Sequence, residues 1–481
     1  MPNVATQRPP VSAEVIARLI AVVGPGGFLQ GPEDTAPYSR SWRGNWVGKT
    51  PLVLRPKTVE DMAAIVRICA QTGTSIVPQG GNTGLTYGGQ PGQGMNEVVV
   101  STVRMNKVRD IDLLNDTITV EAGVVLQDIQ RTAAEQNRLF PLSLGAEGTC
   151  QIGGNLSTNA GGIQVLRYGN TRNLVLGLEV VMPDGRIWNG LRSLRKDNTG
   201  YDLKHLFVGA EGTLGIITAA VLKLFPKPTE SQSAFVAVAS PQASVELLGH
   251  MRSRLGESVT SFELMSRATV DLVLTGVPGT TDPMSDIHPW YVLTEVTGQG
   301  EPGSLAEPLA MTLEAAVESG IAADAVLASS GEQARRLWKM REDLPFGVQA
   351  AGGAIGHDVS VPLSRLPEFI RRADAAMLAA YPTVRFCCFG HVGDGNLHYN
   401  PVRPVDWSYD QFAAERERVN KIVHDIVVEL GGSISAEHGI GLLRLDENLR
   451  YKSAVEIEMM QAVKRAFDPA DIMNPGKVVR L

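Results

Sequence analysis

Thr74-Ser-Ile-Val-Pro-Gln-Gly-Gly-Asn-Thr-Gly84 is the segment of this 481-residue chain that says most about its architecture. Residues Thr74 to Pro78 predict a short buried strand, and the glycine-rich loop Pro78 to Gly84 follows it directly. Successive free N–H groups in such a loop form an anion-binding nest that suits a pyrophosphate. A tight turn without a ligand is the alternative that this loop alone leaves open.

Two further glycine-rich stretches follow in the first half of the chain. One runs from Leu144 to Gly162 and the other from Gly209 to Thr218, and glycine accounts for 50 residues of the whole sequence. Where a chain must be ordered, glycine usually marks a positive φ angle or a close approach of the backbone to another group. Three such stretches suggest a large ligand that lies along the backbone.

The remaining patterns divide the chain. Short helical and strand patterns alternate around the glycine-rich turns in residues 45–225, which is typical of an α+β domain. Residues 230–440 hold longer helical patterns that alternate with strands, and Pro226 and Pro228 mark the change. A last helix is predicted over Tyr451 to Phe467. The sequence therefore predicts domains at 1–225 and 226–440 and a C-terminal segment at 441–481.

The composition excludes several functional classes. Hydrophobic residues make up 43% of the chain, enough for a packed core, and the net charge of −7 argues against non-specific nucleic-acid binding. The four cysteines are too few for a disulfide scaffold and indicate reduced intracellular thiols. The apolar stretch Val15 to Val23 is too short to span a membrane and lacks a basic lead-in. We therefore expect a cytoplasmic enzyme without a transmembrane segment.

The histidines of the second half are candidates for the chemistry. The turn Gly393-Asp-Gly395 joins two predicted strands, and a hairpin there could return His391 beside His398. Two neutral imidazoles with the carboxylate of Glu437 suit a divalent transition metal with an open position, while hydrogen-bonded structural histidines are the alternative. The adjacent His438 can accept a hydroxyl proton at neutral pH.

Arg341 stands out in the predicted helix Glu332 to Val348. It falls on the apolar face formed by residues such as Leu337 and Trp338, where a guanidinium must find an anion or extend to solvent. A guanidinium is also suited to gripping a carboxylate with two hydrogen bonds. Both interpretations stay open: an arginine that extends to solvent near Pro345, and a clamp on the carboxylate of a substrate.

In combination, the three glycine-rich stretches resemble the FAD domain of the vanillyl-alcohol-oxidase type flavoproteins. The later segments resemble the D-2-hydroxyacid dehydrogenase branch of that family, and the resemblance covers roughly residues 45–481. It implies an α+β fold of two domains: an FAD-binding domain and an α+β cap domain with an antiparallel sheet. It also implies that the C-terminal segment returns to the FAD-binding domain.

The resemblance further implies which residues bind FAD. The loop 78–84 would hold the pyrophosphate, and the other two stretches would line the isoalloxazine and the adenosine. No histidine lies in residues 74–94 or 144–170 to tether the flavin, so non-covalent FAD is expected. The FAD-binding residues implied are Pro78, Gly80, Gly81, Asn82, Thr83, Gly84, Leu144, Gly148, Thr149, Gly153, Gly154, Ser157, Thr158, Asn159, Gly161, Gly162, Glu211, Gly212, Gly215, Ile217 and Asn474.

For the second half, the resemblance assigns His391, His398 and Glu437 as ligands of a divalent metal. Zinc is the first expectation, and manganese or iron are alternatives. It assigns His438 as the general base and Arg341 as the partner of the substrate carboxylate. The implied reaction is oxidation of a D-2-hydroxy acid to a 2-oxo acid by hydride transfer to flavin N5. Electrons would then leave to an acceptor protein or a quinone, and a homodimer is expected.

The chain departs from the 2-hydroxyglutarate members of the branch at two positions. Those members carry a threonine four residues after the arginine and a lysine ahead of the next strand, where this chain has Pro345 and Gly356. His357 and Asn400 are further candidates for substrate binding, although a neutral imidazole is a poorer partner for a carboxylate. We therefore expect D-2-hydroxyglutarate, D-lactate or another D-2-hydroxy acid. A same-fold flavin enzyme for a non-acid alcohol, or a flavin subunit of a larger complex, are the alternatives.

Overall fold

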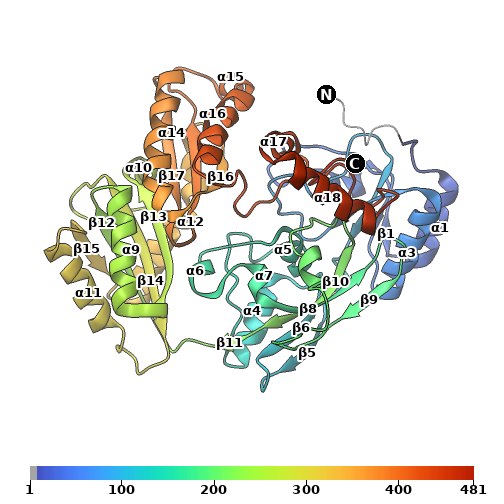
Figure 1. Ribbon diagram of the computed structural model, residues 1–481, viewed down its shortest axis with the longest axis horizontal. Coiled ribbons are helices and arrows are strands. Elements are labelled where there is room, and N and C mark those ends of the chain that lie inside the picture. The colour runs from blue at the N-terminus through green and yellow to red at the C-terminus, as the bar shows by residue number, and fades with distance from the viewer. Residues whose placement is uncertain (1–7) are drawn as a thin grey trace. The chain divides into compact units, whose positions relative to one another are not determined.

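The computed structural model of the chain describes residues 8–481, so the first seven residues of the predicted first domain lie outside the described part. The chain divides into two compact units (Figure 1). Unit 1 comprises the chain up to Gly162, residues 169–227 and residues 437–481, and unit 2 comprises residues 163–168 and 228–436. The boundaries thus fall at 227/228 and 436/437, where the sequence predicts 225/226 and 440/441. The sequence did not predict that residues 163–168, which lie within the first domain by sequence, belong to unit 2.

Unit 1 is built from short helices and strands around the glycine-rich loops. Its helices are α1 (Ala13–Val23), α2 (Pro32–Ser39), α3 (Val59–Thr72), α4 (Leu126–Glu135), α5 (Ile152–Thr158), α7 (Thr171–Leu174), α8 (Lys204–Phe207), α17 (Leu445–Tyr451) and α18 (Ala454–Phe467). Its strands are β1 (Phe28–Leu29), β2 (Val53–Leu54), β3 (Ser75–Gln79), β4 (Glu97–Ser101), β5 (Val108–Asp112), β6 (Thr117–Glu121), β7 (Arg138–Leu139), β8 (Val175–Val181), β9 (Ile187–Gly190), β10 (Ile216–Lys223) and β11 (Phe225–Pro226).

The strands of unit 1 form two main sheets. One has the order β1-β2-β4-β3, with β2 and β3 each parallel to β4, and the other is antiparallel in the order β5-β6-β10-β8-β9. The helix α3 begins where Thr58 accepts a hydrogen bond from the backbone of Asp61, and it ends at the left-handed Gly73. Its apolar face, including Met62 and Ile65, is buried in the core beside β3 and β4.

The C-terminal segment belongs to unit 1, as the resemblance predicts. The N–H of Ile76 in β3 donates to the carbonyl of Ile472 at 2.8 Å, and the N–H of Asn474 donates back to the carbonyl of Ile76 at 2.8 Å. Lys464 of α18 is buried and donates to the carboxylate of Asp468 at 2.6 Å. The segment thereby extends the sheet next to the first glycine-rich loop.

Unit 2 is organised around one antiparallel sheet with the order β15-β12-β14-β13-β17-β18-β16 (Figure 1). The strands are β12 (Glu230–Val238), β13 (Val259–Ser266), β14 (Trp290–Gly298), β15 (Asp324–Leu327), β16 (His357–Ser360), β17 (Arg385–His391) and β18 (Asn396–Val402). The helices are α6 (Val165–Tyr168), α9 (Pro241–Leu255), α10 (Arg267–Gly276), α11 (Ala306–Glu318), α12 (Gly331–Glu342), α13 (Leu344–Ala350), α14 (Leu366–Ala380), α15 (Tyr409–Ala414) and α16 (Arg416–Glu429). This is the predicted α+β cap domain with an antiparallel sheet.

Some predicted elements differ from the structure. The predicted helix over Glu332 to Val348 is divided into α12 and α13 at Asp343, because Pro345 can occupy only the first turn of a helix. The predicted helix over Tyr451 to Phe467 starts only at Ala454, since Ser453 forms a capping box there. Residues 434–440, which carry Glu437 and His438, form neither helix nor strand.

Candidate active site

The three glycine-rich stretches of unit 1 converge on one pocket, which we call the glycine-lined pocket. Its lining shares small side chains and exposed backbone, as the sequence predicts for a ligand laid along the chain. The lining residues are Pro78, Gln79, Gly80, Gly81, Asn82, Thr83, Gly84, Thr86, Gly88, Gly89, Gln90, Thr102, Cys150, Gln151, Gly153, Gly154, Asn155, Ser157, Thr158, Glu211, Gly212, Gly215, Ile216 and Ile217.

The first loop of this pocket presents unused hydrogen-bond donors. Within the described residues, the backbone N–H groups from Gly80 to Gly84 donate to no protein acceptor. Asn82 adopts a left-handed conformation with φ 57°, and its side-chain amide donates to the carbonyls of Pro37 and Arg40, each at 3.0 Å. The loop is therefore fixed while its donors stay available, which is the arrangement of an anion nest.

Glycine is required at one position of the first loop and leaves open space at another, as it does in the second glycine-rich stretch. A Cβ at Gly81 would lie 2.1 Å from the carbonyl oxygen of Thr149, so the two stretches meet backbone to backbone. At Gly84 and at Gly154 an added Cβ would meet no protein atom within 4 Å. The open space beside Gly84 and Gly154 faces the pocket that they line.

Buried acceptors without protein partners also fit a ligand here. Among the described residues, Gln90 Oε1 and Asn155 Oδ1 are buried side-chain oxygens with no hydrogen-bond partner, and both residues line the pocket. A buried acceptor that stays unsatisfied costs free energy, about 1–3 kcal/mol. A polar ligand such as FAD, which carries amide and hydroxyl donors, would satisfy them. The pocket therefore fits the cofactor that the fold implies.

Glu211 links the pocket to the segment that carries His438. Its side chain is buried and accepts hydrogen bonds from the N–H groups of Ile440 at 2.7 Å and Gly441 at 2.8 Å. Burial raises the pKa of Glu211 to about 7, although the two backbone donors act against the increase. The hydroxyl of Thr86 donates to the carbonyl of His438 at 3.1 Å. This backbone network holds the His438 segment at the rim of the glycine-lined pocket.

Several residues that the sequence implies for FAD lie outside the lining of the pocket: Leu144, Gly148, Thr149, Asn159, Gly161, Gly162 and Asn474. Two of them have structural tasks. Asn159 is the left-handed cap of α5, and Asn474 donates through its amide to the carbonyls of Gly88 at 2.9 Å and Glu211 at 2.7 Å. Sequence reasoning missed Gln90 and Asn155, whose only signal is a polar side chain beside a glycine-rich stretch.

In unit 2, Arg341 does not extend to solvent. Its Nε donates to Glu263 Oε2 at 2.7 Å, and its guanidinium lies 4.5 Å from the ring centroid of Phe389. Glu263 in β13 has no exposed side-chain surface. Among the described residues, the terminal Nη groups of Arg341 have no hydrogen-bond partner. The apolar face of α12 thus carries a guanidinium whose Nε is bound to Glu263 and whose two Nη groups remain as donors.

The same glutamate also binds His391. Nδ1 of His391 forms a short hydrogen bond with Glu263 Oε1, and the two residues are direct partners across β13 and β17. Burial opposes ionisation of Glu263, but the adjacent His391 and Arg341 outweigh it and hold the pKa of Glu263 well below its usual range. We refer to Glu263, Arg341 and His391 as the Glu263 cluster. The sequence analysis did not identify Glu263.

The predicted hairpin brings the two histidines together. The ring centroids of His391 and His398 lie 5.9 Å apart, with the rings at 76°. Asp358 of β16 is the partner of His398 in β18, and a carboxylate oxygen of Asp358 lies within 4.8 Å of a ring nitrogen of His398. Imidazole nitrogens and a carboxylate oxygen on adjacent strands are a donor set that suits a divalent transition metal.

The other predicted residues of the second half are placed as follows. The N–H of Ala436 donates to the carbonyl of Asp358 at 3.2 Å, and Glu437 and His438 follow next in the chain. Within that segment, His438 Nε2 lies 3.8 Å from Glu437 Oε1. His357 is buried, and its Nδ1 is 3.0 Å from the carbonyl oxygen of Tyr399. Nδ1 of this imidazole is thus bound to the sheet and does not face a substrate.

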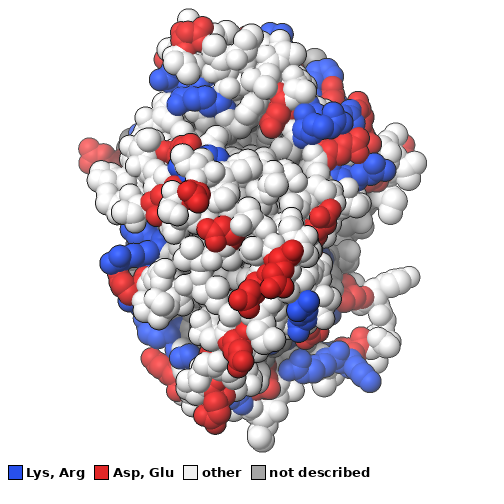
Figure 2. All heavy atoms as spheres, turned by 90° about the vertical axis from the view of Figure 1, so that its left-hand side faces the viewer, with Lys and Arg blue, Asp and Glu red and all other residues white. Residues whose placement is uncertain are grey.

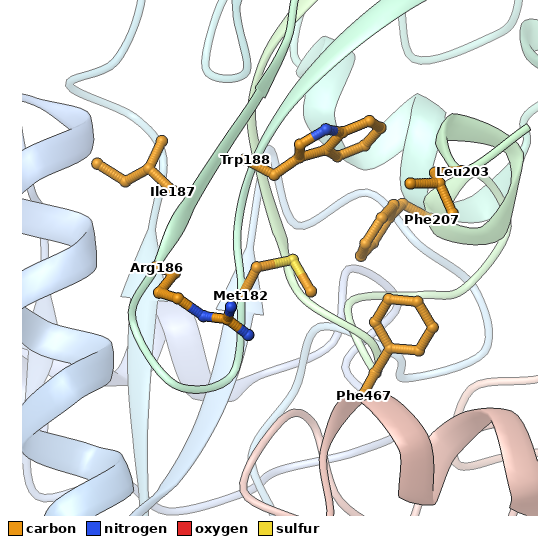
Figure 3. Close-up of a pocket in the computed structure, with 7 residues that line it drawn as sticks. All are labelled: Met182, Arg186, Ile187, Trp188, Leu203, Phe207 and Phe467. Atoms are coloured by element: carbon orange, nitrogen blue, oxygen red, sulfur yellow. The ribbon is translucent and has the colours of Figure 1, made fainter. Parts of the chain in front are cut away.

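A second hollow of about 330 Å³ in unit 1 contains none of the predicted site residues. Figure 3 shows the rings of Trp188, Phe207 and Phe467 around it, with centroids 5.7 Å apart for Trp188 and Phe207 and 5.6 Å apart for Phe207 and Phe467. Its other lining residues are Met182, Arg186, Ile187 and Leu203. An apolar surface without nucleophile or base offers no chemistry, so the candidate active site lies elsewhere.

The surface carries charges of both signs. On the face in Figure 2, acidic and basic side chains are interspersed among uncharged ones, without the extended basic area that nucleic-acid binding requires. In residues 8–481, no helix has both the length and the apolar character needed to cross a bilayer.

Comparison with known proteins identifies the family. Residues 50–190 match the family described as FAD binding domain, and residues 227–478 match FAD linked oxidases, C-terminal domain. The chain is 37% identical over 447 residues to D-2-hydroxyglutarate dehydrogenase of Xanthomonas citri pv. viticola, which covers 93% of each protein. The chain belongs to the FAD-linked D-2-hydroxyacid dehydrogenases. The dehydrogenase is thus an FAD-dependent oxidoreductase, and the predicted family and the predicted use of FAD are confirmed.

Further relatives agree. The dehydrogenase is 37% identical over 470 residues to the mitochondrial D-2-hydroxyglutarate dehydrogenase of Bos taurus, covering 98% of this chain and 84% of the relative. It is 35% identical over 459 residues to D-2-hydroxyglutarate–pyruvate transhydrogenase of Saccharomyces cerevisiae, covering 94% and 90%. The solved structure of p-cresol methylhydroxylase superposes with a TM-score of 0.76 at 19% identity, covering 98% of this chain and 99% of that one. This likeness confirms the vanillyl-alcohol-oxidase type fold.

Proposed function

We propose that the dehydrogenase oxidises a D-2-hydroxy acid to the corresponding 2-oxo acid. The observation that carries this proposal is Arg341, whose Nε is anchored on Glu263 while its Nη groups have no partner among the described residues. A guanidinium held in this way presents two parallel N–H donors, the geometry that a carboxylate accepts. The names of the relatives, which act on D-2-hydroxyglutarate, support the same class of substrate.

The other residues of the site divide the remaining tasks. His438 accepts the proton of the substrate hydroxyl, since an imidazole is the base that works near neutral pH. His391, His398 and Glu437 hold a divalent metal, zinc first and manganese or iron as alternatives, and Asp358 beside His398 is a further candidate ligand. A metal at this place would lower the pKa of the hydroxyl that is oxidised. FAD, held without a covalent bond in the glycine-lined pocket, supplies the acceptor for the hydride from C2.

Residues 345 and 356 bear on which D-2-hydroxy acid is the substrate, because the 2-hydroxyglutarate members carry a threonine and a lysine there. Pro345 and Gly356 carry no charge, and the imidazole of His357 is bound to the sheet through Nδ1. This supports a small or apolar acid such as D-lactate alongside D-2-hydroxyglutarate. Electrons then pass to an acceptor protein or a quinone. The homodimer and the cytoplasmic location stay predictions.

Anaerobic single-turnover reduction of the flavin tests the proposal. The purified protein is mixed with D-lactate, L-lactate, D-2-hydroxyglutarate, D-malate or D-mandelate, with and without EDTA, and the flavin absorbance is followed. We expect rapid bleaching by at least one D-acid, no bleaching by L-lactate, and loss of the reaction in EDTA. Absence of bleaching by every acid in metal-replete protein would refute the proposal and point to a non-acid alcohol or to a missing partner subunit.

The base is tested by His438→Ala. Because general base catalysis contributes roughly 10²–10⁴-fold, we expect kcat to fall by that factor while the FAD content stays unchanged. His250→Ala is the control, since His250 lies in α9 and contacts only the carbonyl of Thr312 at 3.0 Å. An unchanged kcat in His438→Ala would remove this residue from the reaction.

A further inference from the structure

Glu263 is a buried carboxylate whose two oxygens serve two different functional side chains. Oε2 accepts from Arg341 Nε at 2.7 Å, and Oε1 forms a short hydrogen bond with His391 Nδ1. The three residues come from separate elements: β13, α12 and β17. A carboxylate with no exposed surface is costly to keep charged unless cationic or donor partners compensate it. The burial of Glu263 is therefore explained by these partners and not by packing.

The contact with Arg341 decides which edge of the guanidinium remains for a ligand. A guanidinium can bind a carboxylate through Nε and one Nη or through both Nη groups. Because Glu263 occupies Nε, only the end formed by the two Nη groups is left. The ring of Phe389, 4.5 Å away, fixes the plane of the guanidinium. Glu263 thus sets the direction from which the substrate carboxylate is bound.

The contact with His391 decides which nitrogen remains for a metal. A carboxylate that accepts from Nδ1–H holds the imidazole in the tautomer whose Nε2 carries the free electron pair. The same contact orients the ring and raises its basicity as a ligand. With Nδ1 bound to Glu263, Nε2 is the nitrogen through which His391 would bind a metal shared with His398, whose ring centroid lies 5.9 Å away.

We propose that Glu263 is a positioning residue that couples the substrate-binding Arg341 to the metal-binding His391. This inference rests on the proposed function, because it takes Arg341 as the carboxylate partner and His391 as a metal ligand. It goes further by assigning one residue, on a strand that sequence reasoning did not single out, to both tasks. Loss of its charge must then weaken metal binding and substrate binding together.

The test compares Glu263→Gln with a matched control, Glu295→Gln. Glu295 lies on the neighbouring strand β14, and within residues 8–481 the hydrogen bond that its carboxylate accepts comes from Ser231, at 2.9 Å, and not from the cluster. Each protein is depleted of metal and titrated with Co²⁺, whose visible absorption bands report coordination, and KM and kcat are measured for the D-2-hydroxy acid that bleaches the wild-type flavin. We expect Glu263→Gln to bind Co²⁺ 10- to 100-fold more weakly and to show a KM raised about tenfold. We expect Glu295→Gln to match the wild type in both.

A third variant separates positioning from a general loss of structure. Glu263→Asp keeps the carboxylate, but the side chain is shorter by one methylene group, so both contacts become longer. We therefore expect a Co²⁺ affinity and a KM between those of the wild type and Glu263→Gln. Wild-type values for both quantities in Glu263→Gln would overturn the inference. Should Glu263→Gln fail to fold, wild-type values in Glu263→Asp would overturn it equally. Failure of the wild type itself to bind Co²⁺ or to be reduced by any hydroxy acid would overturn the proposed function, and the inference with it.

Discussion

Two buried glutamates behave in opposite ways in the two units of the dehydrogenase. Glu211 in unit 1 accepts from the backbone N–H groups of Ile440 and Gly441, and burial raises its pKa to about 7 although these donors and the charge of Lys477 oppose the increase. Glu263 in unit 2 accepts from Arg341 and His391, and its pKa is held well below the usual range. The two N–H donors and the charge of Lys477 do not outweigh the desolvation of Glu211, whereas the direct side-chain partners Arg341 and His391 outweigh that of Glu263.

This contrast extends to the sites around the two glutamates. The glycine-lined pocket binds through backbone donors and open space, so substitutions there should act through shape. The Glu263 cluster consists of side chains whose charges compensate one another, so substitutions there should act through charge. Each unit can therefore be tested with substitutions that alter shape and preserve charge, or alter charge and preserve shape.

Replacement of Arg341 by lysine should have the largest effect. Lysine keeps the positive charge but loses the fork that binds Glu263 and, in the proposed function, a substrate carboxylate as well. Disruption of a buried, hydrogen-bonded charge pair costs about 4 kcal/mol, which corresponds to a kcat/KM roughly a thousandfold lower. Steady-state kinetics with the D-acid that reduces the flavin measure this fall in kcat/KM.

Arg335→Lys is the control, because Arg335 is an exposed residue of the same helix whose partner is Glu332. This variant should keep the wild-type kcat/KM. A kcat/KM within tenfold of the wild type in Arg341→Lys would show that charge alone suffices.

The two sites also differ in how far the sequence predicts them. The glycine-lined pocket was predictable because glycine clusters are local in sequence and report backbone geometry directly. Glu263 was not, since its partner His391 lies far along the chain and the two meet only through pairing of β13 with β17. The available signal was a lone acidic residue in the buried strand Val259–Ser266, which must find a compensating partner.

The same distinction applies to the fold. Thr58 and Gly73 predict the ends of α3 because capping is local, and the structure places the ends there. The irregular path of residues 434–440 depends on Glu211, which binds this segment from a distant part of the sequence. Local chemistry thus predicts the elements, while the approach of distant segments decides how the site is assembled.

Replacement of Glu211 by glutamine should remove a pH dependence of stability. The folded pKa is raised from 4.5 to about 7, so this group contributes stability that is fully present below pH 4.5 and is lost as the pH rises through 7. At 1.36 kcal/mol per pKa unit, the loss amounts to roughly 3 kcal/mol at most. Glutamine also places an amide donor against two N–H groups, a penalty that does not vary with pH. The free energy of unfolding, measured with urea at pH 5 and pH 8, should differ less between the two pH values for Glu211→Gln than for the wild type.

Glu135 is exposed, so Glu135→Gln should leave this pH difference unchanged. A pH difference in Glu211→Gln equal to that of the wild type would exclude the Glu211 carboxyl as its source.

Replacement of Gly154 by alanine should have the smallest effect and the most specific one. Gly154 lies within α5, where alanine is favoured over glycine by about 1 kcal/mol, and the added methyl would meet no protein atom within 4 Å. The protein should therefore be as stable as the wild type or slightly more so.

The methyl group added in Gly154→Ala would nevertheless occupy space in the glycine-lined pocket. We therefore expect FAD to bind about tenfold more weakly, which is about 1.4 kcal/mol. Gly249→Ala is the matched control, because Gly249 is also helical and open but lies in α9 of unit 2 and does not line the pocket. Opposite signs for stability and FAD affinity in Gly154→Ala, with stability alone changed in Gly249→Ala, would show that this site is shaped for its ligand at the expense of its own helix. An FAD affinity equal to the wild type in both variants would place the flavin away from Gly154.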